Sequence, residues 1–131
     1  MAIRVFLMDD HEVVRRGLSD LITSAPGIEV VGEAGTCAEG LQGILVKRPD
    51  VAVLDYNLGK GPNGIDLANQ LRKIQPHIAI VLLTAFLDPA QLDKRVAELP
   101  AGSRYLIKHS VTKIEVLIEE IKEALKSAPT T

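Results

Sequence analysis

Charged and hydroxyl side chains directly follow four of the five apolar segments in this sequence. Asp9 and Asp10 follow the first segment, Asp55 the third, Thr84 the fourth and Lys108 the fifth. Three neighbouring carboxylates repel one another at neutral pH unless a cation lies among them. Carboxylate oxygens suit Mg²⁺, which is usually held by carboxylates together with water and a phosphate group. When a metal ion and a lysine offset the negative charge, a carboxylate can attack phosphorus, so Asp55 is the candidate nucleophile of a phosphoryl-transfer site.

The five apolar segments are predicted to form the strands that position these side chains. Residues 51–54 give the clearest strand, because four consecutive apolar residues before Asp55 are typical of a strand buried on both faces. The other predicted strands are residues 3–8, 28–34, 78–83 and 105–107. Segments with helical spacing of apolar residues lie between and after them. This alternation predicts an α/β fold with a parallel sheet and helices on both faces.

Five helices are predicted, and three of them have a recognisable start. Thr36 and Thr112 each precede a glutamate by three residues, which fits a capping box, and Asp88-Pro89 fits a cap followed by proline. The residues expected to face the core are Val14, Leu18, Leu21 and Ile22 in the first helix, Leu41, Ile44 and Leu45 in the second, Leu67, Leu71 and Ile74 in the third, Leu92, Val96 and Leu99 in the fourth, and Ile114, Leu117, Ile118, Ile121 and Leu125 in the fifth.

A five-stranded parallel sheet of the flavodoxin-like order 2-1-3-4-5 would bring the polar side chains together. In that order the first and third strands are neighbours, and ligands bind outside the carboxyl ends of the strands at such a switch point. Asp9, Asp10 and Asp55 would converge there, beside the hydroxyl of Thr84 and the ammonium of Lys108. A lysine charge and a threonine hydroxyl both suit phosphoryl oxygens.

The overall composition predicts one globular domain in the cytoplasm. The chain has 131 residues, 47% of them hydrophobic, and no apolar run long enough to span a bilayer. A net charge of −2, no basic run and only 3% aromatic residues argue against nucleic-acid or membrane binding by this chain. A single cysteine allows no internal disulfide and favours a reducing compartment, and no signal peptide is expected at the amino terminus. Residues 1–126 are predicted to form the domain, and the polar residues 127–131 the start of a linker.

The order of these motifs resembles the receiver domain of two-component response regulators. Segment 10–18 further resembles the NarL/FixJ type, whose receivers usually precede a LuxR-type helix-turn-helix domain. The motifs behind the resemblance are Asp9-Asp10, Asp55 after an apolar strand, Thr84-Ala85, and Tyr105 three residues before Lys108.

The resemblance implies a role for each of these residues. A phosphoryl group would pass from the phosphohistidine of a sensor histidine kinase to Asp55, with Mg²⁺ required and Mn²⁺ as an alternative. The metal would be held by Asp10, Asp55, the backbone carbonyl of Asn57, and Asp9 through a water molecule. Thr84, Ala85 and Lys108 would bind the phosphoryl group, and Asn57 and Phe86 would tune its hydrolysis.

The resemblance also implies a switch. Thr84 would move toward the phosphoryl group, and Tyr105 would turn inward into the vacated space. The fourth helix, the fifth strand and the fifth helix would then present an altered face to a second receiver, giving a homodimer. The domain would in this way control a DNA-binding output domain and transcription, with no substrate turnover of its own.

Two other functions remain open at this point. A pseudo-receiver would signal without phosphate, although no acid, threonine or lysine of the motif is missing. A metal-dependent aspartyl phosphatase needs a second aspartate two residues after the first, where this sequence has Asn57. Taken singly, each site residue also has an ordinary explanation, such as a cap or a turn for an aspartate and a core position for Tyr105.

Three further residues near the site have structural interpretations. His11 is expected at the start of a helix on the rim of the site and not as a ligand, because carboxylate sites favour hard cations. Cys37 is expected to be a buried, inert thiol. His109 stands where the family often has a proline after a cis bond, so a trans bond is expected there.

Overall fold

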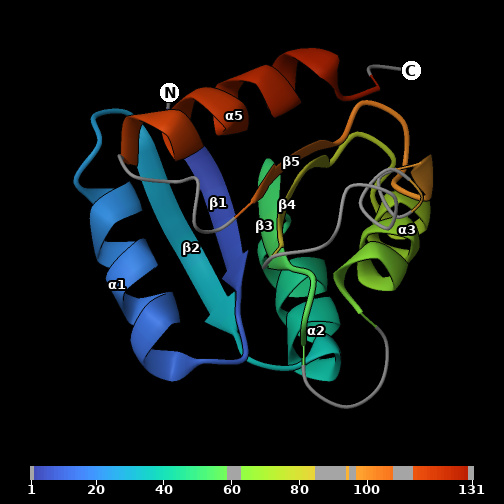
Figure 1. Ribbon diagram of the computed structural model, residues 1–131, viewed down its shortest axis with the longest axis horizontal. Helices are drawn as coiled ribbons and strands as arrows, with labels where there is room; N and C mark the ends of the chain where they lie inside the picture. The colour runs from blue at the N-terminus through green and yellow to red at the C-terminus, as the bar shows by residue number, and fades with distance from the viewer. Residues whose placement is uncertain (1, 59–62, 85–93, 95–96, 108–113, 130–131) are drawn as a thin grey trace.

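A five-stranded parallel sheet lies at the centre of the protein, with its strands in the order β2-β1-β3-β4-β5 (Figure 1). The computed structural model describes residues 2–58, 63–84, 94, 97–107 and 114–129. The strands are β1 (Ile3–Met8), β2 (Ile28–Ala34), β3 (Val51–Asp55), β4 (Ala79–Thr84) and β5 (Arg104–Ile107). The predicted strand order is confirmed, and each strand begins and ends within one residue of its prediction.

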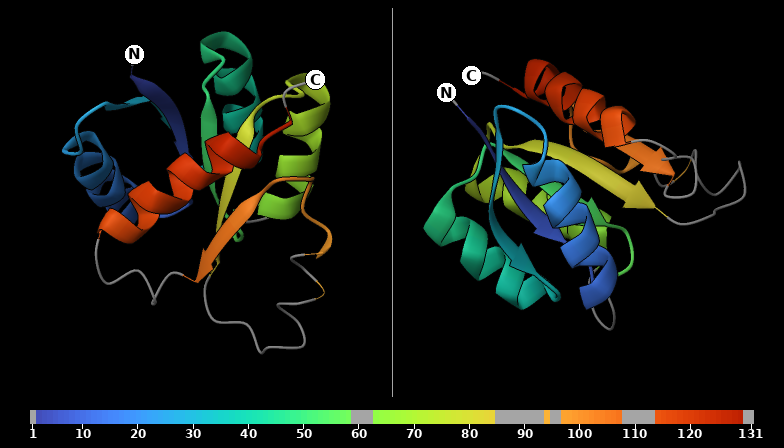
Figure 2. Two further views of the ribbon diagram at one scale, coloured as in Figure 1. Left: turned by 90° about the horizontal axis from the view of Figure 1, so that it is seen from above. Right: turned by 90° about the vertical axis from the view of Figure 1, so that its left-hand side faces the viewer.

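Within the described part of the chain, four helices cover the sheet: α1 (Glu12–Thr23), α2 (Cys37–Lys47), α3 (Gly64–Ile74) and α5 (Ile114–Ser127). Helices α1 and α5 lie on one face, and α2 and α3 lie on the other (Figures 1 and 2). Several predictions fall outside the described residues. These are the helix after Asp88-Pro89 with Leu92 and Val96, the cap at Thr112, the site residues Ala85, Phe86 and Lys108, and the peptide bond before His109. Among the described residues, no helix is both long enough and apolar enough to cross a membrane.

Two apolar cores lie on opposite faces of the sheet, and alternate residues of each strand belong to opposite cores. In β1, Phe6 and Met8 join the core under α2 and α3, while Val5 and Leu7 join the core under α1 and α5. This follows from the two-residue repeat of a strand. All five residues of β3 are buried, as the apolar run predicted. The sheet therefore holds the ends of its central strands rigidly.

The helix caps show how local sequence fixes these elements. The side chain of Thr36 accepts a hydrogen bond from the Glu39 backbone N–H at 3.2 Å, so the predicted cap of α2 is present. Helix α3 has a full capping box that the sequence interpretation did not include. The Asn63 side chain accepts from Asp66 N at 2.9 Å, and the Asp66 carboxylate accepts from Asn63 N at 3.3 Å. This cap starts α3 at Gly64.

Four residues that were predicted to face the core are instead between 39% and 50% exposed. They are Val14 and Leu21 in α1, Leu45 in α2 and Ile74 in α3. These predictions were wrong because each helix contacts the sheet through a narrower stripe than the pattern suggested. In α1, Ile22 is the only fully buried residue. The apolar residues at the flanks of the stripe remain half exposed to solvent.

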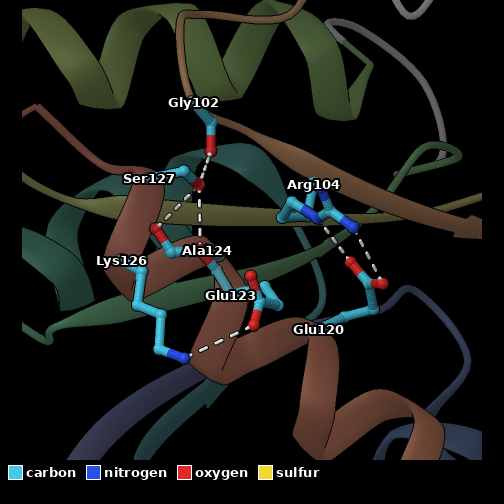
Figure 3. Close-up of polar contacts among 7 residues, drawn as sticks. All are labelled: Gly102, Arg104, Glu120, Glu123, Ala124, Lys126 and Ser127. Carbon is cyan, nitrogen blue, oxygen red and sulfur yellow. Dashed lines mark hydrogen bonds and ion pairs between the residues drawn. The ribbon is translucent and has the colours of Figure 1, made fainter.

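Helix α5 ends in a set of polar contacts with the segment that leads into β5 (Figure 3). The Ser127 hydroxyl donates to the Gly102 carbonyl at 2.7 Å, and Arg104 donates to the Glu120 carboxylate at 2.7 and 3.2 Å. Ala128 is buried, and the His77 ring lies 2.7 Å from the Pro129 carbonyl. The packing of the domain thus extends to Pro129, beyond the boundary expected after residue 126. The expectation that a linker follows stays a prediction.

We expect the Gly17→Ala variant to be more stable than the wild type by about 0.5–1 kcal/mol. Gly17 lies inside α1, and a Cβ built on it meets no atom within 4 Å. Alanine therefore adds helix propensity without a clash. Urea unfolding measures the difference. Gly27→Ala is the matched control, because its Cβ also meets open space but its φ of +78° strains any L side chain. Gly27→Ala is expected to lower stability, and a gain at both positions would refute the argument.

Candidate functional site

The register of the sheet brings the carboxylates of β1 and β3 to the same edge. Met8 pairs with Leu54, so the next residues, Asp9 and Asp55, leave adjacent strands at the same level. Asp55 in turn pairs with Leu83, and Thr84 follows as the last residue of β4. Strand β5 reaches the same edge, since Ile107 pairs with Thr84. The predicted convergence of strand ends is therefore present for every site residue that the structure describes on these strands.

Burial sets these residues apart from the rest of the polar side chains. Among the described residues, the buried polar or charged ones are Asp9, Asp55 and Thr84, with 1%, 2% and 1% exposure. Burial of an ionised carboxylate is costly unless charge partners or hydrogen bonds offset it. Two such carboxylates and a hydroxyl at one sheet edge therefore need groups around them that offset their burial. An arrangement of this kind is typical of a functional site.

Local hydrogen bonds orient both buried carboxylates. Asp9 Oδ1 accepts from the His11 backbone N–H at 2.9 Å, and Asp55 Oδ1 accepts from the Asn57 backbone N–H at 3.2 Å. Both are bonds from residue i+2 to the side chain of residue i, a pattern that favours Asp at turns. The chain therefore turns away from the sheet immediately after each aspartate and leaves the carboxylate at the edge.

Asp9, Asp10 and His11 form a group that can hold a metal ion, because one ligand atom from each lies within 4.8 Å of the others. His11 Nδ1 lies 3.0 Å from Asp10 Oδ1 and 3.6 Å from Asp9 Oδ1. His11 occupies the N-cap position of α1 without a side-chain cap hydrogen bond, and its side chain is 72% exposed, as expected for a residue on the rim. Asp55 lies at the same edge but is not a member of this group, and Asn57 is exposed.

Thr84 and Tyr105 lie on neighbouring strands and on the same face of the sheet. Leu82 pairs with Tyr105 and Thr84 with Ile107, so the two residues are offset by one two-residue repeat. Tyr105 is 40% exposed, whereas Thr84 is buried. The alternative interpretation of Tyr105 as a core residue is therefore wrong.

Comparison with known proteins decides the family. Residues 5–122 match the family model of the response regulator receiver domain. This chain belongs to the response regulator receiver domains. The predicted resemblance, including the NarL/FixJ type, is thereby confirmed.

The receiver domain is similar to several transcriptional regulators. It is 48% identical over 107 residues to the DNA-binding transcriptional activator DevR/DosR of Mycobacterium tuberculosis, covering 81% of this chain and 48% of that protein. It is 37% identical over 128 residues to the transcriptional regulatory protein LiaR of Bacillus subtilis, covering 97% of this chain and 58% of that protein. The receiver domain thus spans about half the length of these relatives.

Solved structures give the same fold. The response regulator domain of Thermotoga maritima CheB matches with a TM-score of 0.82 at 24% identity, covering 98% of this chain and all of that one. The receiver domain of the putative response regulator NarL from Mycobacterium tuberculosis matches with a TM-score of 0.81 at 26% identity, covering 95% of this chain and 97% of that one. The flavodoxin-like fold of the receiver domain is confirmed.

The sequence interpretation missed two residues that support the site. A guanidinium nitrogen of Arg15 donates to the Asp9 carbonyl at 2.8 Å. Gly64 packs so closely on the Asp55 carbonyl that a Cβ on this glycine would overlap the carbonyl oxygen. Gly64 lies in the glycine-rich segment 57–64, and this segment was the sequence signal that could have revealed its role. The contact of Arg15 depends on how α1 lies against the sheet, so helical spacing alone could not reveal it.

We expect Cys37 to react with iodoacetamide several-fold more slowly in the folded receiver domain than in the urea-unfolded chain. Cys37 is partly buried, and not fully buried as predicted. This partial burial raises the pKa of the Cys37 thiol, and the nearby carboxylate of Asp66 raises it further. Because the thiolate is the nucleophile, a raised pKa leaves less reactive thiol at mildly alkaline pH. Mass spectrometry of timed samples measures the two rates. Equal rates would show that the fold does not suppress the thiolate.

Proposed function

We propose that this receiver domain accepts a phosphoryl group from a sensor histidine kinase onto Asp55, in a reaction that requires Mg²⁺. The observation that supports this most directly is the burial of Asp9, Asp55 and Thr84 together at the carboxyl edge of the sheet. Two buried acids at one sheet edge repel each other, and a bound cation would offset that repulsion.

The chemistry follows from the residues at this edge. A carboxylate oxygen of Asp55 attacks phosphorus, the bond between phosphorus and the kinase imidazole nitrogen breaks, and the imidazole leaves with the bonding electron pair. The Asn57 backbone N–H bond holds Asp55 in one orientation for this attack. Asp10, Asp55, the Asn57 carbonyl and, through water, Asp9 would hold the metal, with Mn²⁺ as the alternative ion. The bound cation supplies charge neutralisation for the phosphoryl oxygens.

The same proposal gives Thr84, Ala85 and Lys108 the binding of the phosphoryl group, and Asn57 and Phe86 the tuning of its hydrolysis. Ala85, Phe86 and Lys108 lie outside the described residues. For Thr84, burial on the last position of β4 supports a role next to Asp55. A threonine hydroxyl can donate one hydrogen bond to a phosphoryl oxygen.

We further propose that phosphorylation changes the surface made by the predicted fourth helix, β5 and α5. The 40% exposure of Tyr105 is consistent with an unphosphorylated starting state, from which the ring would turn inward as Thr84 moves toward the phosphoryl group. The altered surface would pair two receivers. Since the curated relatives are about twice as long and are transcriptional regulators, the partner function would be control of a DNA-binding output domain, in the cytoplasm and without substrate turnover.

Intact mass measurement after incubation with Mg²⁺ and acetyl phosphate tests the proposal. The expected result is a gain of one phosphoryl group in the presence of Mg²⁺. This group is expected to be lost again over time, and samples treated with EDTA before the incubation are expected to gain none. Many turnovers of a phosphomonoester would favour a phosphatase instead. No uptake and no turnover would favour a pseudo-receiver that signals without phosphate.

A further inference from the structure

Arg15 connects three segments that surround the acidic turn after β1. One of its guanidinium nitrogens donates to the backbone carbonyl of Asp9 at 2.8 Å, and its Nε donates to the Glu33 carboxylate at 3.3 Å. Arg15 belongs to α1 and Glu33 to β2, so the side chain crosses from the helix to the strand over the turn. Its side chain is 16% exposed, compared with 70% for the neighbouring Arg16.

The carbonyl that Arg15 binds has a particular importance for the metal site. This carbonyl belongs to the peptide unit between Asp9 and Asp10. The orientation of that peptide unit therefore determines the position of the Asp10 Cα and the direction in which its side chain leaves the backbone. On the other side, the Asp9 backbone N–H donates to the Ala34 carbonyl at 3.2 Å. Rotation of the Asp9–Asp10 peptide would carry the Asp10 carboxylate away from Asp9. Arg15 opposes that rotation by binding its oxygen.

The structure provides space for this contact at Gly35. A Cβ on Gly35 would lie 2.9 Å from an Arg15 guanidinium nitrogen and 3.7 Å from the Asp9 carbonyl oxygen. Any side chain at this position would therefore press on the guanidinium. Gly35 after β2 and Glu33 within β2 thus define the place where the Arg15 guanidinium lies against the acidic turn.

Charge alone does not explain the arrangement. A guanidinium near two aspartates opposes the binding of a cation, since like charges repel. The ion pair of Arg15 with Glu33 offsets much of that repulsion. The remaining effect of Arg15 is geometric, because its hydrogen bond holds the Asp9–Asp10 peptide in one orientation.

We propose that Arg15, seated on Glu33 and Gly35, is a positioning residue that pre-organises Asp9 and Asp10 for the binding of Mg²⁺. This inference rests on the proposed function, because it assigns the acidic turn to that metal. Residues that support metal ligands in this indirect way typically change metal affinity by about 10–100-fold when they are lost. Because Arg15 acts through the backbone, the expected effect is at the lower end of that range.

The test is the Mg²⁺ affinity of the Arg15→Met variant, measured by isothermal titration calorimetry on the full chain. We expect a Kd about tenfold higher than that of the wild type, with phosphoryl uptake recovering at saturating Mg²⁺. The sign of the effect is informative. Loss of a positive charge by itself would tighten Mg²⁺ binding, so weaker binding points to lost geometry.

Two further variants separate this role from general stability. Arg16→Met removes an exposed arginine whose ion pair with Glu12 lies on the helix surface, and it is expected to leave the Mg²⁺ affinity unchanged. Arg15→Lys keeps the charge and can still reach one acceptor, so it is expected to recover part of the affinity. If Arg15→Met does not fold, Gly35→Ala takes its place, because its Cβ would press on the guanidinium without changing any charge, and a smaller loss in the same direction is expected.

Unchanged or tighter Mg²⁺ binding by the Arg15→Met variant, or by Gly35→Ala in its place, would overturn the inference. An equal loss in Arg16→Met would also overturn it, because the effect would then not belong to the Asp9 contact. Failure of the wild-type chain to bind Mg²⁺ or to take up a phosphoryl group is a different outcome. It would remove the proposed function itself.

Discussion

The Asp55→Asn variant is expected to take up no phosphoryl group from acetyl phosphate in the presence of Mg²⁺. An amide oxygen is a far weaker nucleophile than a carboxylate, and the variant also loses one of the charges that attract the metal. The fold should remain, because the asparagine side chain oxygen can still accept the Asn57 backbone N–H that Asp55 accepts now. Intact mass measurement detects the loss.

The control for this prediction is Asp20→Asn, an exposed aspartate within α1. It removes the same charge from the chain but not from the sheet edge, so full phosphoryl uptake is expected. Urea unfolding of the Asp55→Asn variant adds a second readout, because a cooperative transition shows that the loss of uptake does not come from a loss of the fold. Continued uptake by Asp55→Asn would mean that another residue is the acceptor.

The Gly64→Ala variant is expected to lose about 3 kcal/mol of stability and most of its phosphoryl uptake. The added Cβ would overlap the Asp55 carbonyl oxygen and lie 3.0 Å from both the Asp55 carbonyl carbon and Leu82 Cδ1. The backbone at Asp55 cannot shift easily, because β3 is paired with both β1 and β4. Relief would require a shift of α3 or of Asp55 itself. Urea unfolding and intact mass measurement follow the two effects.

Gly40→Ala is the matched control for Gly64→Ala. Its Cβ also overlaps existing atoms, but those atoms are the Cε and Sδ of Met8, at the far end of a flexible side chain. A methionine can change rotamer within the core, so the expected loss is smaller, about 1 kcal/mol. Because Gly40 is in α2 and does not touch Asp55, phosphoryl uptake should persist. Equal losses in the two variants would contradict the distinction between backbone and side-chain contacts.

The sequence predicted those parts of the fold that depend on short continuous patterns. The run before Asp55 predicted a strand buried on both faces, and all of β3 is buried. Placement of Asp9, Asp55 and Thr84 at one edge followed from the strand order, which the alternation of elements and the family resemblance indicated. In these cases a local signal was sufficient because parallel strands end at a common edge.

Other features depend on how elements lie against one another, and these were missed. The half exposure of Leu21 results from the seating of α1 on the sheet, which spacing within one helix does not determine. The contact of Arg15 with the Asp9 carbonyl likewise depends on how a helix lies against the neighbouring strands. The capping box of Asn63 and Asp66 is different, because its residues were visible in the sequence and could have been recognised.

The contacts after α5 determine the point at which the chain leaves the domain. Gly102 and His77, which bind Ser127 and Pro129, stand just before β5 and β4, at the amino end of the strands. Asp55 stands at the opposite end, and the six residues of β4 cover about 20 Å between the two ends. Any polypeptide attached beyond Pro129 thus begins at the opposite end of the strands from the acceptor carboxylate. A structural change caused by phosphorylation therefore has to reach that polypeptide through the domain, or the polypeptide has to fold back along the whole length of a strand.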